Sequence, residues 1–400
     1  MNNTNLMWIP AVRMGLCRIS YAQNGLPVFF VPDTSEYALS LVTKDKFEKI
    51  CRQKGIPAII VSKKDDPVKL ADEIEFASKK SIPHVVAVEG TGIGGVGFSV
   101  LQAREAIESL INKSDVSHEI TVSSVNKRLT GCSAIVTGGA QGFGRGIAEE
   151  MLAEGAAIVI ADMNEQTGII AVEEMNKKFG KGSTVFVRTD VTNKASIDLC
   201  VEAALKSFGG VDMLVSNAGV LKAGGIEEMD EKSFDFVTSV NYKAYFLCVQ
   251  AVVPLMKLQR KCCEKHFMDI IQINSKSGLE GSNKNFAYAG SKFGGIGLTQ
   301  SFALELVEYG IKVNAICPGN YYEGPLWSDP EKGLFVQYLR AGKVPGAKTI
   351  EDVKAFYVGK VPMKRGCSPA DVAKAIFYLH EQNYETGQAL PVTGGQVMLN

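Results

Sequence analysis

The sequence has no excess of either charge: 43 Lys and Arg residues face 43 Asp and Glu residues, giving a net charge of zero over 400 positions. Proteins that bind nucleic acid by neutralising phosphates need a basic surplus, so this balance argues against that class. No apolar run reaches the roughly 18 residues of a membrane-spanning helix, so no membrane span is expected. The hydrophobic content of 46% excludes a disordered chain and indicates a folded globular protein.

The nine cysteines form no CxxC pair, and their number is odd. This usage indicates reduced thiols rather than a disulfide framework, and it favours a cytoplasmic location. The first residues, MNNTNLMWIPAVRMG, lack a basic region followed by an apolar one, so no signal peptide is expected.

Residues 1–126 alternate short apolar segments with helical patterns. Strands are expected at 28–32, 57–62 and 84–88, and helices around 45–54, 67–80 and 99–112. The alternation predicts a small N-terminal α/β lobe. The polar, Ser-rich segment 113–128 is interpreted as a linker.

Residues 127–400 repeat a strict strand–helix alternation. The expected strands lie at 133–137, 157–161, 184–189, 213–215, 270–274 and 312–316. Strands that alternate with helix-length segments predict an α/β fold with a Rossmann-like, doubly wound parallel sheet. The chain is therefore divided into the lobe 1–126 and this second domain.

A glycine-rich turn, TGGAQGFG, occupies residues 137–144 between an expected strand and an expected helix. Glycines there allow a tight turn and bring a pyrophosphate close to the N-terminal amides of the helix. Such a turn alone is weak evidence, because an ordinary strand–helix connection can look the same. Asp162 ends the next strand, where a carboxylate accepts the ribose hydroxyls of NAD and repels the 2′-phosphate of NADP. The combination predicts an NAD site.

Tyr288 and Lys292 are four residues apart in a segment that continues as a helix, which places both on one face. A tyrosine with a pKa of about 10 is a poor base, but a neighbouring cation favours the phenolate. Ser275 follows an expected strand thirteen residues earlier, and its hydroxyl could hold a substrate oxygen. Each feature alone is common by chance, since a serine after a strand is more often a turn residue.

The order and spacing of these motifs from about residue 129 to 400 resemble the short-chain dehydrogenase/reductase family. The matching features are TGGAQGFG at 137–144, Asp162, Asp190-Val191, Asn217-Ala218-Gly219, Asn241, Ser275, Tyr288-x-x-x-Lys292 and Pro318-Gly319. The resemblance implies that Ser275 stabilises the reacting oxygen and Tyr288 is the acid/base. It implies that Lys292 lowers the pKa of Tyr288 and binds the nicotinamide ribose, and that Asn241 holds a relay water.

The same resemblance implies a set of cofactor contacts: Gly138, Gln141, Gly142, Phe143, Gly144, Asp162, Met163, Asp190, Val191, Asn217, Ala218, Gly219, Tyr288, Lys292, Pro318 and Gly319. One departure is visible. Many members place a threonine after the Pro-Gly pair, whereas this chain continues Asn320-Tyr321-Tyr322. No metal ligand set is expected.

Three parts of the chain resemble the sorbitol-6-phosphate 2-dehydrogenases and related sugar-alcohol dehydrogenases: residues 273–278, 292–311, and 361–367 with 384–398. The resemblance implies NAD-dependent interconversion of D-sorbitol 6-phosphate and D-fructose 6-phosphate. Lys276 and Arg365 are candidate phosphate contacts, because cations pair with a phosphate and arginine does so bidentately. Alternatively, Lys276 is a solvated loop lysine and Arg365 caps a helix or faces water.

The insertion at 320–366 is predicted to be a lid over the substrate. Its Trp327, Phe335 and Tyr338 either anchor the lid or form a small core of its own.

Residues 86–103 resemble the segment that precedes the dehydrogenase in fusions with a class II aldolase. An active aldolase needs a cluster of histidine ligands, but this lobe contains only His84 and His118 and no HxH pair. The glycines at 90–97 could mark a second nucleotide site, yet no acidic residue follows on a suitable strand. We therefore expect a degenerate lobe used for packing, oligomerisation or covering the active site.

Two alternative functions stay open at this point. The enzyme could act on an unphosphorylated polyol or another ketose, or the chain could be a non-catalytic NAD-sensing scaffold. The expected partner is a small molecule rather than nucleic acid or membrane, and the family resemblance implies a homodimer or homotetramer.

Overall fold

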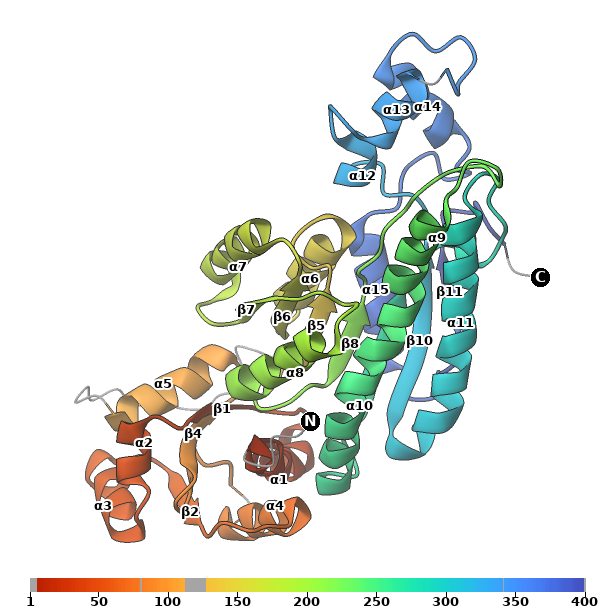
Figure 1. The fold of residues 1–400 in the computed structure, drawn as a ribbon. Helices are drawn as coiled ribbons and strands as arrows, with labels where there is room; N and C mark the ends of the chain where they lie inside the picture. Colours follow the sequence, from red (N-terminus) through yellow and green to blue (C-terminus); the bar gives the residue numbers. More distant parts are fainter. Residues whose placement is uncertain (1–5, 80, 112–126, 341, 399–400) are drawn as a thin grey trace.

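The computed structural model describes residues 6–79, 81–111, 127–340 and 342–398, and its strands form two separate sheets (Figure 1). Most of the predicted linker, residues 113–126, lies outside the described residues. No helix in the described ranges is long and apolar enough to cross a membrane.

The larger sheet has seven parallel strands in the order β11-β10-β9-β8-β5-β6-β7. Their bounds are Ser133–Thr137 (β5), Ala157–Asp162 (β6), Thr184–Arg188 (β7), Met213–Ser216 (β8), Met268–Ile273 (β9), Ile311–Pro318 (β10) and Ala389–Val392 (β11). The predicted doubly wound α/β fold is confirmed. The central strands are apolar and buried throughout because helices cover both faces of the sheet. The sequence did not reveal β11, which is short, half-buried and contains Pro391, a residue tolerated at a sheet edge.

Helices pack on the two faces of this sheet in separate hydrophobic layers. One layer contains α6 (Gly142–Ala153), α7 (Glu165–Phe179) and α15 (Pro369–Glu381). The other contains α8 (Lys194–Phe208), α10 (Ala244–Cys262) and α11 (Phe286–Leu306). A short helix, α9 (Glu231–Thr238), joins α10 through one π-helical turn, η2 (Ser239–Lys243).

The N-terminal lobe is built on a four-stranded sheet in the order β1-β4-β3-β2. Its strands are Phe29–Asp33 (β1), Ala58–Val61 (β2), Val85–Val88 (β3) and Gly92–Gly97 (β4), and its helices are Trp8–Asn24 (α1), Glu36–Leu41 (α2), Lys44–Lys54 (α3), Pro67–Ala77 (α4) and Val100–Ile111 (α5). The expected strands and helices are present. The sequence patterns did not predict α1, α2 or β4.

The glycine run of the lobe is strand β4, hydrogen-bonded to β1 and β3, rather than a phosphate-binding loop. A Cβ at Gly94 would lie 2.3 Å from the ring of Phe30, and one at Gly95 would lie 1.8 Å from the carbonyl oxygen of Ala103. The glycines therefore let an aromatic ring and helix α5 approach the two faces of the strand.

The lobe packs against the amino ends of the parallel strands, far from the helices of the insertion (Figure 1). Helix α1 contacts α10 and α8, and the rings of Phe29 and Phe208 meet at 6.5 Å between centroids. Lobe and dehydrogenase residues share one hydrophobic core. This placement agrees with a packing role and places the lobe away from the carboxyl ends of the strands. The idea that it covers the active site of its own chain is therefore wrong.

The insertion at 320–366 carries α12 (Pro325–Ser328), α13 (Leu334–Arg340) and α14 (Ile350–Gly359). Its aromatic side chains form a small hydrophobic core of their own: Trp327 lies 5.1 Å from Phe335 and 5.9 Å from Tyr338 between ring centroids. Of the two interpretations of these aromatic residues, the structure favours the separate core.

Candidate active site

The candidate catalytic residues lie at the carboxyl end of β9 and on the helix beside it. Ser275 lies two residues after the end of β9 and caps the short 3-10 turn η3 (Lys276–Gly278), where its hydroxyl accepts the backbone N–H of Ser277 at 3.1 Å. Tyr288 and Lys292 lie one turn apart on α11. The Ser275 hydroxyl lies near enough to the Tyr288 phenol to lower the pKa of Tyr288. The structure therefore brings together the three residues that the sequence predicted.

Burial controls the ionisation of this group. It raises the pKa of Tyr288, and the Ser275 hydroxyl opposes that increase. Burial also lowers the pKa of Lys292 from 10.5 to about 8. The Lys292 ammonium lies 5.6 Å from the centre of the Tyr288 ring and donates to the carbonyl of Ile273 at 3.0 Å. A cation at this position favours the phenolate form of Tyr288.

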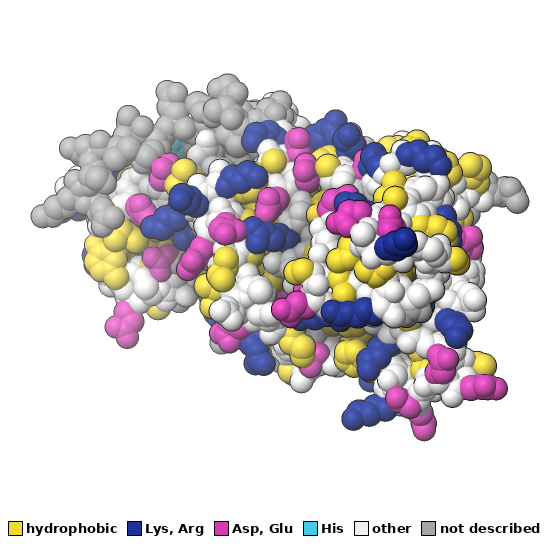
Figure 2. All heavy atoms as spheres, turned by 90° about the horizontal axis from the view of Figure 1, so that it is seen from above, with side chains coloured by type: hydrophobic (Ala, Val, Ile, Leu, Met, Phe, Trp, Pro, Cys, Tyr) yellow, Lys and Arg dark blue, Asp and Glu magenta, His cyan; other side chains and the backbone are white. Residues whose placement is uncertain are grey.

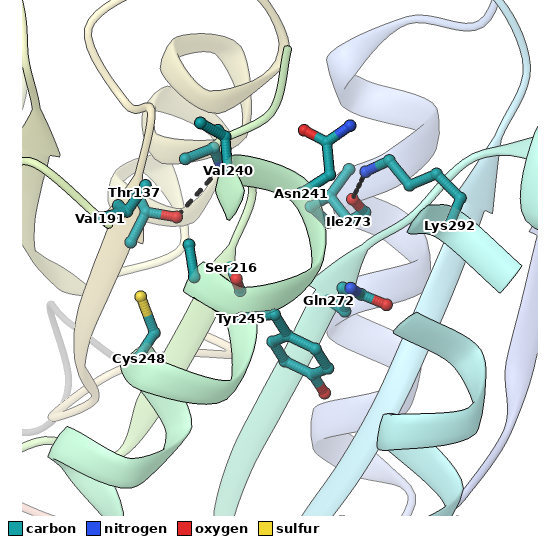
Figure 3. A pocket seen from close by; sticks show the side chains of 12 residues that line it. Thr137, Val191, Ser216, Val240, Asn241, Tyr245, Cys248, Gln272, Ile273 and Lys292 are labelled. Atoms are coloured by element: carbon teal, nitrogen blue, oxygen red, sulfur yellow. Dashed lines mark hydrogen bonds between the residues drawn. The ribbon is translucent and has the colours of Figure 1, made fainter. Parts of the chain in front are cut away.

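Asn241 lies in the π-helical turn η2, a local feature that is frequent at functional sites. Its amide exchanges two hydrogen bonds of 2.8 Å with the backbone of Val220 and donates to Ser291 at 3.2 Å. In Figure 3 the Asn241 and Lys292 side chains lie close together. Both approach Gly219, whose added Cβ would lie 3.4 Å from Asn241 Oδ1 and 3.8 Å from Lys292 Nζ. The role of Asn241 as holder of a relay water stays a prediction.

A small pocket lies below these residues, between the ends of the central strands and α10 (Figure 3). Its lining includes polar side chains from several elements: Thr137, Ser216, Asn241, Gln272 and Lys292.

The glycine-rich turn has the geometry of an anion cradle. Gly138 and Gly142 have φ values of 62° and 59°, which only glycine adopts readily. A Cβ at Gly144 would lie 2.1 Å from the carbonyl oxygen of Gly138, so the first turn of α6 can approach this loop only without a side chain. Asp162 braces the turn, because one carboxylate oxygen accepts the N–H of Ala140 at 3.0 Å and the other that of Asn164 at 3.0 Å. A carboxylate with two such bonds still has lone pairs for ribose hydroxyls.

Thr137 was not predicted as a site residue, yet it connects the glycine-rich turn to the loop after β8. Its hydroxyl accepts the backbone N–H groups of Asn217 and Ala218, each at 3.0 Å. The Asn217 amide in turn donates to the carbonyls of Thr137 and Gly138. The glycine cradle, the braced Asp162 and these loops fit a dinucleotide.

The other predicted cofactor contacts follow strand ends at the same edge of the sheet. Gln141 and Phe143 begin α6, and the Phe143 ring packs on Tyr321 of the insertion at 4.9 Å between centroids. The remaining contacts lie just after β6 and β7 and at the end of β10: Met163, Asp190, Val191, Pro318 and Gly319.

Both predicted substrate cations have acidic partners. Lys276 Nζ lies 3.4 Å from Oε1 of Glu280, four residues along the chain. Arg365 binds both oxygens of Asp371 in the first turn of α15, which is the helix-end position of the alternative interpretation. Lys, Arg, Asp and Glu side chains are interspersed over the face in Figure 2.

Cys317, another residue that the sequence did not single out, lies near the end of β10 beside this group. Its burial raises the pKa of the thiol to about 11, while Lys292 opposes that increase, so the thiol is neutral near pH 7. Its position directly before Pro318 was the only available signal. Within the described ranges, no cluster of three or more His, Cys, Asp or Glu side chains could hold a metal ion.

The chain belongs to the short-chain dehydrogenase/reductase family, and it is an oxidoreductase that uses a nicotinamide cofactor. The family described as short chain dehydrogenase matches residues 133–327. Sorbitol-6-phosphate 2-dehydrogenase of Escherichia coli is 38% identical over 271 residues, which are 66% of this chain and 98% of that enzyme.

Solved structures agree with this assignment. The structure of sorbitol-6-phosphate 2-dehydrogenase from Erwinia amylovora matches with a TM-score of 0.60 and 38% identity, covering 66% of this chain and all of that one. A 3-ketoacyl-(acyl-carrier-protein) reductase from Brucella melitensis, complexed with NADH, matches with a TM-score of 0.56 and 27% identity, covering 66% and 98%. These relatives match two thirds of the chain, and the likeness of residues 86–103 to aldolase fusions stays a prediction.

Proposed function

We propose that this enzyme interconverts D-sorbitol 6-phosphate and D-fructose 6-phosphate with NAD. The observation that supports this substrate is the 38% identity to the Escherichia coli sorbitol-6-phosphate 2-dehydrogenase across nearly the whole of that protein. The second match under the same name, from Erwinia amylovora, supports it.

The reaction needs one proton transfer, and the residues at the end of β9 and on α11 provide it. NAD, when bound, would supply the hydride chemistry at the alcohol carbon, as acceptor in its oxidised form and as donor in its reduced form. Ser275 holds the reacting oxygen, and Tyr288 removes the hydroxyl proton or returns it to the carbonyl. Lys292 stabilises the phenolate, and Asn241 holds the water that connects Lys292 to solvent.

The preference for NAD over NADP rests on Asp162. A carboxylate at the end of β6 accepts ribose hydroxyls and repels a 2′-phosphate. The glycine cradle of 138–144 and the loops at 190–191, 217–219 and 318–319 hold the rest of the cofactor.

For the phosphate of the substrate, we propose contacts with Lys276 and Arg365. Lys276 directly follows Ser275 in the turn η3, and this position supports a contact with the substrate phosphate. Arg365 keeps donors beyond those bound by Asp371 and Gly366, because a guanidinium has five N–H groups.

The insertion 320–366 is proposed as the lid of this site in the catalytic domain 127–400, with 1–126 a structural lobe. The base of the insertion lies over the glycine-rich turn, where Tyr321 packs on Phe143 and Pro325 is 3.9 Å from a Cβ added at Gly142.

The test is a panel of polyols and polyol phosphates followed by NADH absorbance. We expect turnover of D-sorbitol 6-phosphate with a kcat/KM at least about 100-fold above that of sorbitol, because a phosphate site discriminates by several kcal/mol. Equal oxidation of sorbitol would contradict the proposed substrate. Lys276→Ala should raise the KM for the phosphorylated substrate, and Lys194→Ala is its matched control, because Lys194 forms the same i,i+4 ion pair with Asp198 on α8.

An unphosphorylated polyol or another ketose is the second candidate. The observation that favours it is the pairing of both candidate cations, Lys276 with Glu280 and Arg365 with Asp371. The same panel separates the two candidates.

We further propose a homodimer or homotetramer that uses α11, and a cytoplasmic location. On α11 the side-chain directions of Gly290 and Gly297 meet open space, and Leu304 is 82% exposed. The nine free, buried cysteines support a reducing compartment. Light scattering of the full chain should give two or four times the monomer mass of 43.1 kDa.

A further inference from the structure

Two buried amide side chains at the carboxyl end of β9 contact the helix that carries Tyr288 and Lys292. Gln272 and Asn274 are two residues apart and therefore lie on one face of the strand, and they are only 2% and 3% exposed. The Asn274 amide nitrogen donates to Gln272 Oε1 at 2.8 Å and to the backbone carbonyl of Lys292 at 2.9 Å. Its oxygen accepts the backbone N–H of Ser275 at 2.8 Å. One side chain thus connects the backbone of Ser275 to that of Lys292.

The orientation of this amide follows from its neighbours. The nitrogen faces two oxygen acceptors and the oxygen faces an N–H group, so a rotated amide would place oxygen against oxygen. A buried amide that loses these partners costs free energy, because its polar atoms have no water to replace them.

Two glycines pack closely against the amide side chains of Asn274 and Gln272. A Cβ added at Gly278 would lie 2.2 Å from Asn274 Oδ1, and one added at Gly295 would lie 2.5 Å from Gln272 Nε2. Glycine at these two positions therefore lets the turn after Ser275 approach Asn274 and lets α11 approach Gln272.

Both the side chain and the backbone of Lys292 are consequently hydrogen-bonded to two adjacent residues at the carboxyl end of β9. Its ammonium donates to the carbonyl of Ile273, and its own carbonyl accepts from Asn274. We propose that Asn274 is a positioning residue that sets the register of α11 against β9 and so aligns Tyr288 and Lys292 with Ser275. This inference rests on the proposed catalytic roles of those three residues.

The groups that face Lys292 explain why a small displacement would change the pH profile. They are the Tyr288 phenol on the same helix, the Cys317 thiol on β10, and Asn241 in η2. Cys317 is neutral near pH 7, so the charge state beside the reacting oxygen is set by Tyr288 and Lys292. Because the pKa of Lys292 is about 8, a change in its surroundings shifts its protonation within the working range.

The test compares Asn274→Ala with Asn314→Ala. Asn314 is the matched control: it is buried on the neighbouring strand β10, donates to the carbonyl of Glu385 and accepts from the N–H of Gln388, both at 3.0 Å. We expect Asn274→Ala to lower kcat about 10- to 100-fold with little change in KM and to shift the pH–rate profile. Asn314→Ala should leave kcat and the pH–rate profile unchanged, while its thermal stability should be similar to that of Asn274→Ala. Asn274→Ser serves as the second variant if the alanine variant does not fold.

A substrate-independent measurement separates this inference from the proposed function. The ultraviolet absorbance of the Tyr288 phenolate, taken as the difference from a Tyr288→Phe partner, reports the pKa of Tyr288 without any sugar. That pKa should rise in Asn274→Ala and stay constant in Asn314→Ala. An unchanged phenolate titration in Asn274→Ala would overturn the positioning role, as would equal losses of kcat in the two variants. A wild-type enzyme inactive on sorbitol 6-phosphate would overturn only the proposed substrate.

Discussion

Arg13 of the N-terminal lobe forms a buried, bidentate ion pair with Asp212 at the amino end of β8. The distances are 2.9 Å from Nη1 to Oδ1 and 2.6 Å from Nη2 to Oδ2, and neither side chain is more than 4% exposed. Arg13 also donates to the carbonyls of Val28 and Gly131, and Asp212 also accepts from Ser133 and lies 2.7 Å from His266. The ion pair therefore joins the lobe to the dehydrogenase sheet at the amino ends of its strands, opposite the end that carries the active site.

Removing Arg13 should destabilise the whole chain. Arg13→Ala leaves Asp212 buried without its main partner, which costs about 3–5 kcal/mol of unfolding free energy. Urea unfolding at pH 7 measures the change. Lys206→Ala is the control, because its i,i+4 pair with Glu202 is on the surface and should contribute less than about 0.5 kcal/mol. Equal small losses in both variants would show that the buried pair is dispensable.

The contribution of Asp212 should depend on pH. Arg13 and His266 hold the pKa of Asp212 well below its ordinary value, although burial alone would raise it. A lowered folded-state pKa gives stability that is fully present above the unfolded pKa of about 3.9 and is lost as pH falls toward the folded value. The difference in unfolding free energy between wild type and Arg13→Ala should therefore shrink as pH falls below about 4. A difference that stays constant down to pH 2 would contradict this linkage.

The sequence predicted the parts of the molecule that local patterns encode. The apolar strands between helices predicted the parallel sheet, and Tyr288 and Lys292 lie one turn apart on α11 as their spacing indicated. The family resemblance, rather than spacing, indicated that Ser275 would lie beside them. The pair of Arg13 and Asp212 could not be predicted, because 199 residues separate them and only the packing of the lobe brings them together.

The same limit explains the other differences. The glycines of β4 resembled a phosphate-binding loop. They are required because the ring of Phe30 and the backbone of Ala103 pack against this strand, and both come from elsewhere in the chain. The position of Arg365 beside Asp371, six residues away, depends on where α15 begins. Asn274 carries no local signal at all, since its partners Ser275 N–H and Lys292 C=O acquire meaning only when α11 packs on β9.

Tyr288→Phe should strongly reduce turnover while NADH still binds. The variant loses the proton donor and acceptor but keeps the ring, so turnover should fall by about 100- to 10,000-fold. The fluorescence titration of NADH should give a dissociation constant within about threefold of wild type. Tyr21→Phe is the matched control, because its hydroxyl contacts His266 in the lobe interface and is remote from the site. Turnover that survives in Tyr288→Phe would refute the proposed acid/base.

Asp162→Asn should weaken the proposed preference for NAD over NADP. The amide keeps an oxygen for the N–H of Ala140 but removes the negative charge that repels a 2′-phosphate. We expect the ratio of kcat/KM values for the two cofactors to fall by about tenfold or more, which corresponds to about 1.4 kcal/mol. Asp190→Asn is the control, because Asp190 bonds Thr192 and is predicted to contact adenine rather than ribose. A wild-type enzyme that uses NADPH equally well would contradict the role of Asp162.

Lys292→Met should make the cofactor-free enzyme more stable at pH 7 while removing its activity. The buried ammonium has no carboxylate partner among the described residues, and its pKa is lowered from 10.5 to about 8, which corresponds to about 3 kcal/mol of destabilisation at pH 7. Losing the hydrogen bond to Ile273 offsets about 1 kcal/mol, so a gain of about 2 kcal/mol remains.

The change in stability caused by Lys292→Met should depend on pH. Because the folded pKa is below the unfolded value, the charged form is disfavoured on folding below pH 8, and the penalty disappears as pH rises from 8 to 10.5. The stability gain of Lys292→Met should therefore be about 2 kcal/mol at pH 7 and shrink above pH 8, and near pH 10.5 the lost hydrogen bond should leave the variant slightly less stable than wild type. Lys312→Met is the opposite control: Lys312 is equally buried but lies 3.0 Å from Asp269 and donates to backbone carbonyls at the end of α15. Its loss removes these bonds and leaves Asp269 with His380 as its remaining ionic partner, so it should destabilise the chain by about 3 kcal/mol. If both variants lose stability at pH 7, the buried ammonium of Lys292 does not destabilise the folded enzyme, and the prediction is wrong.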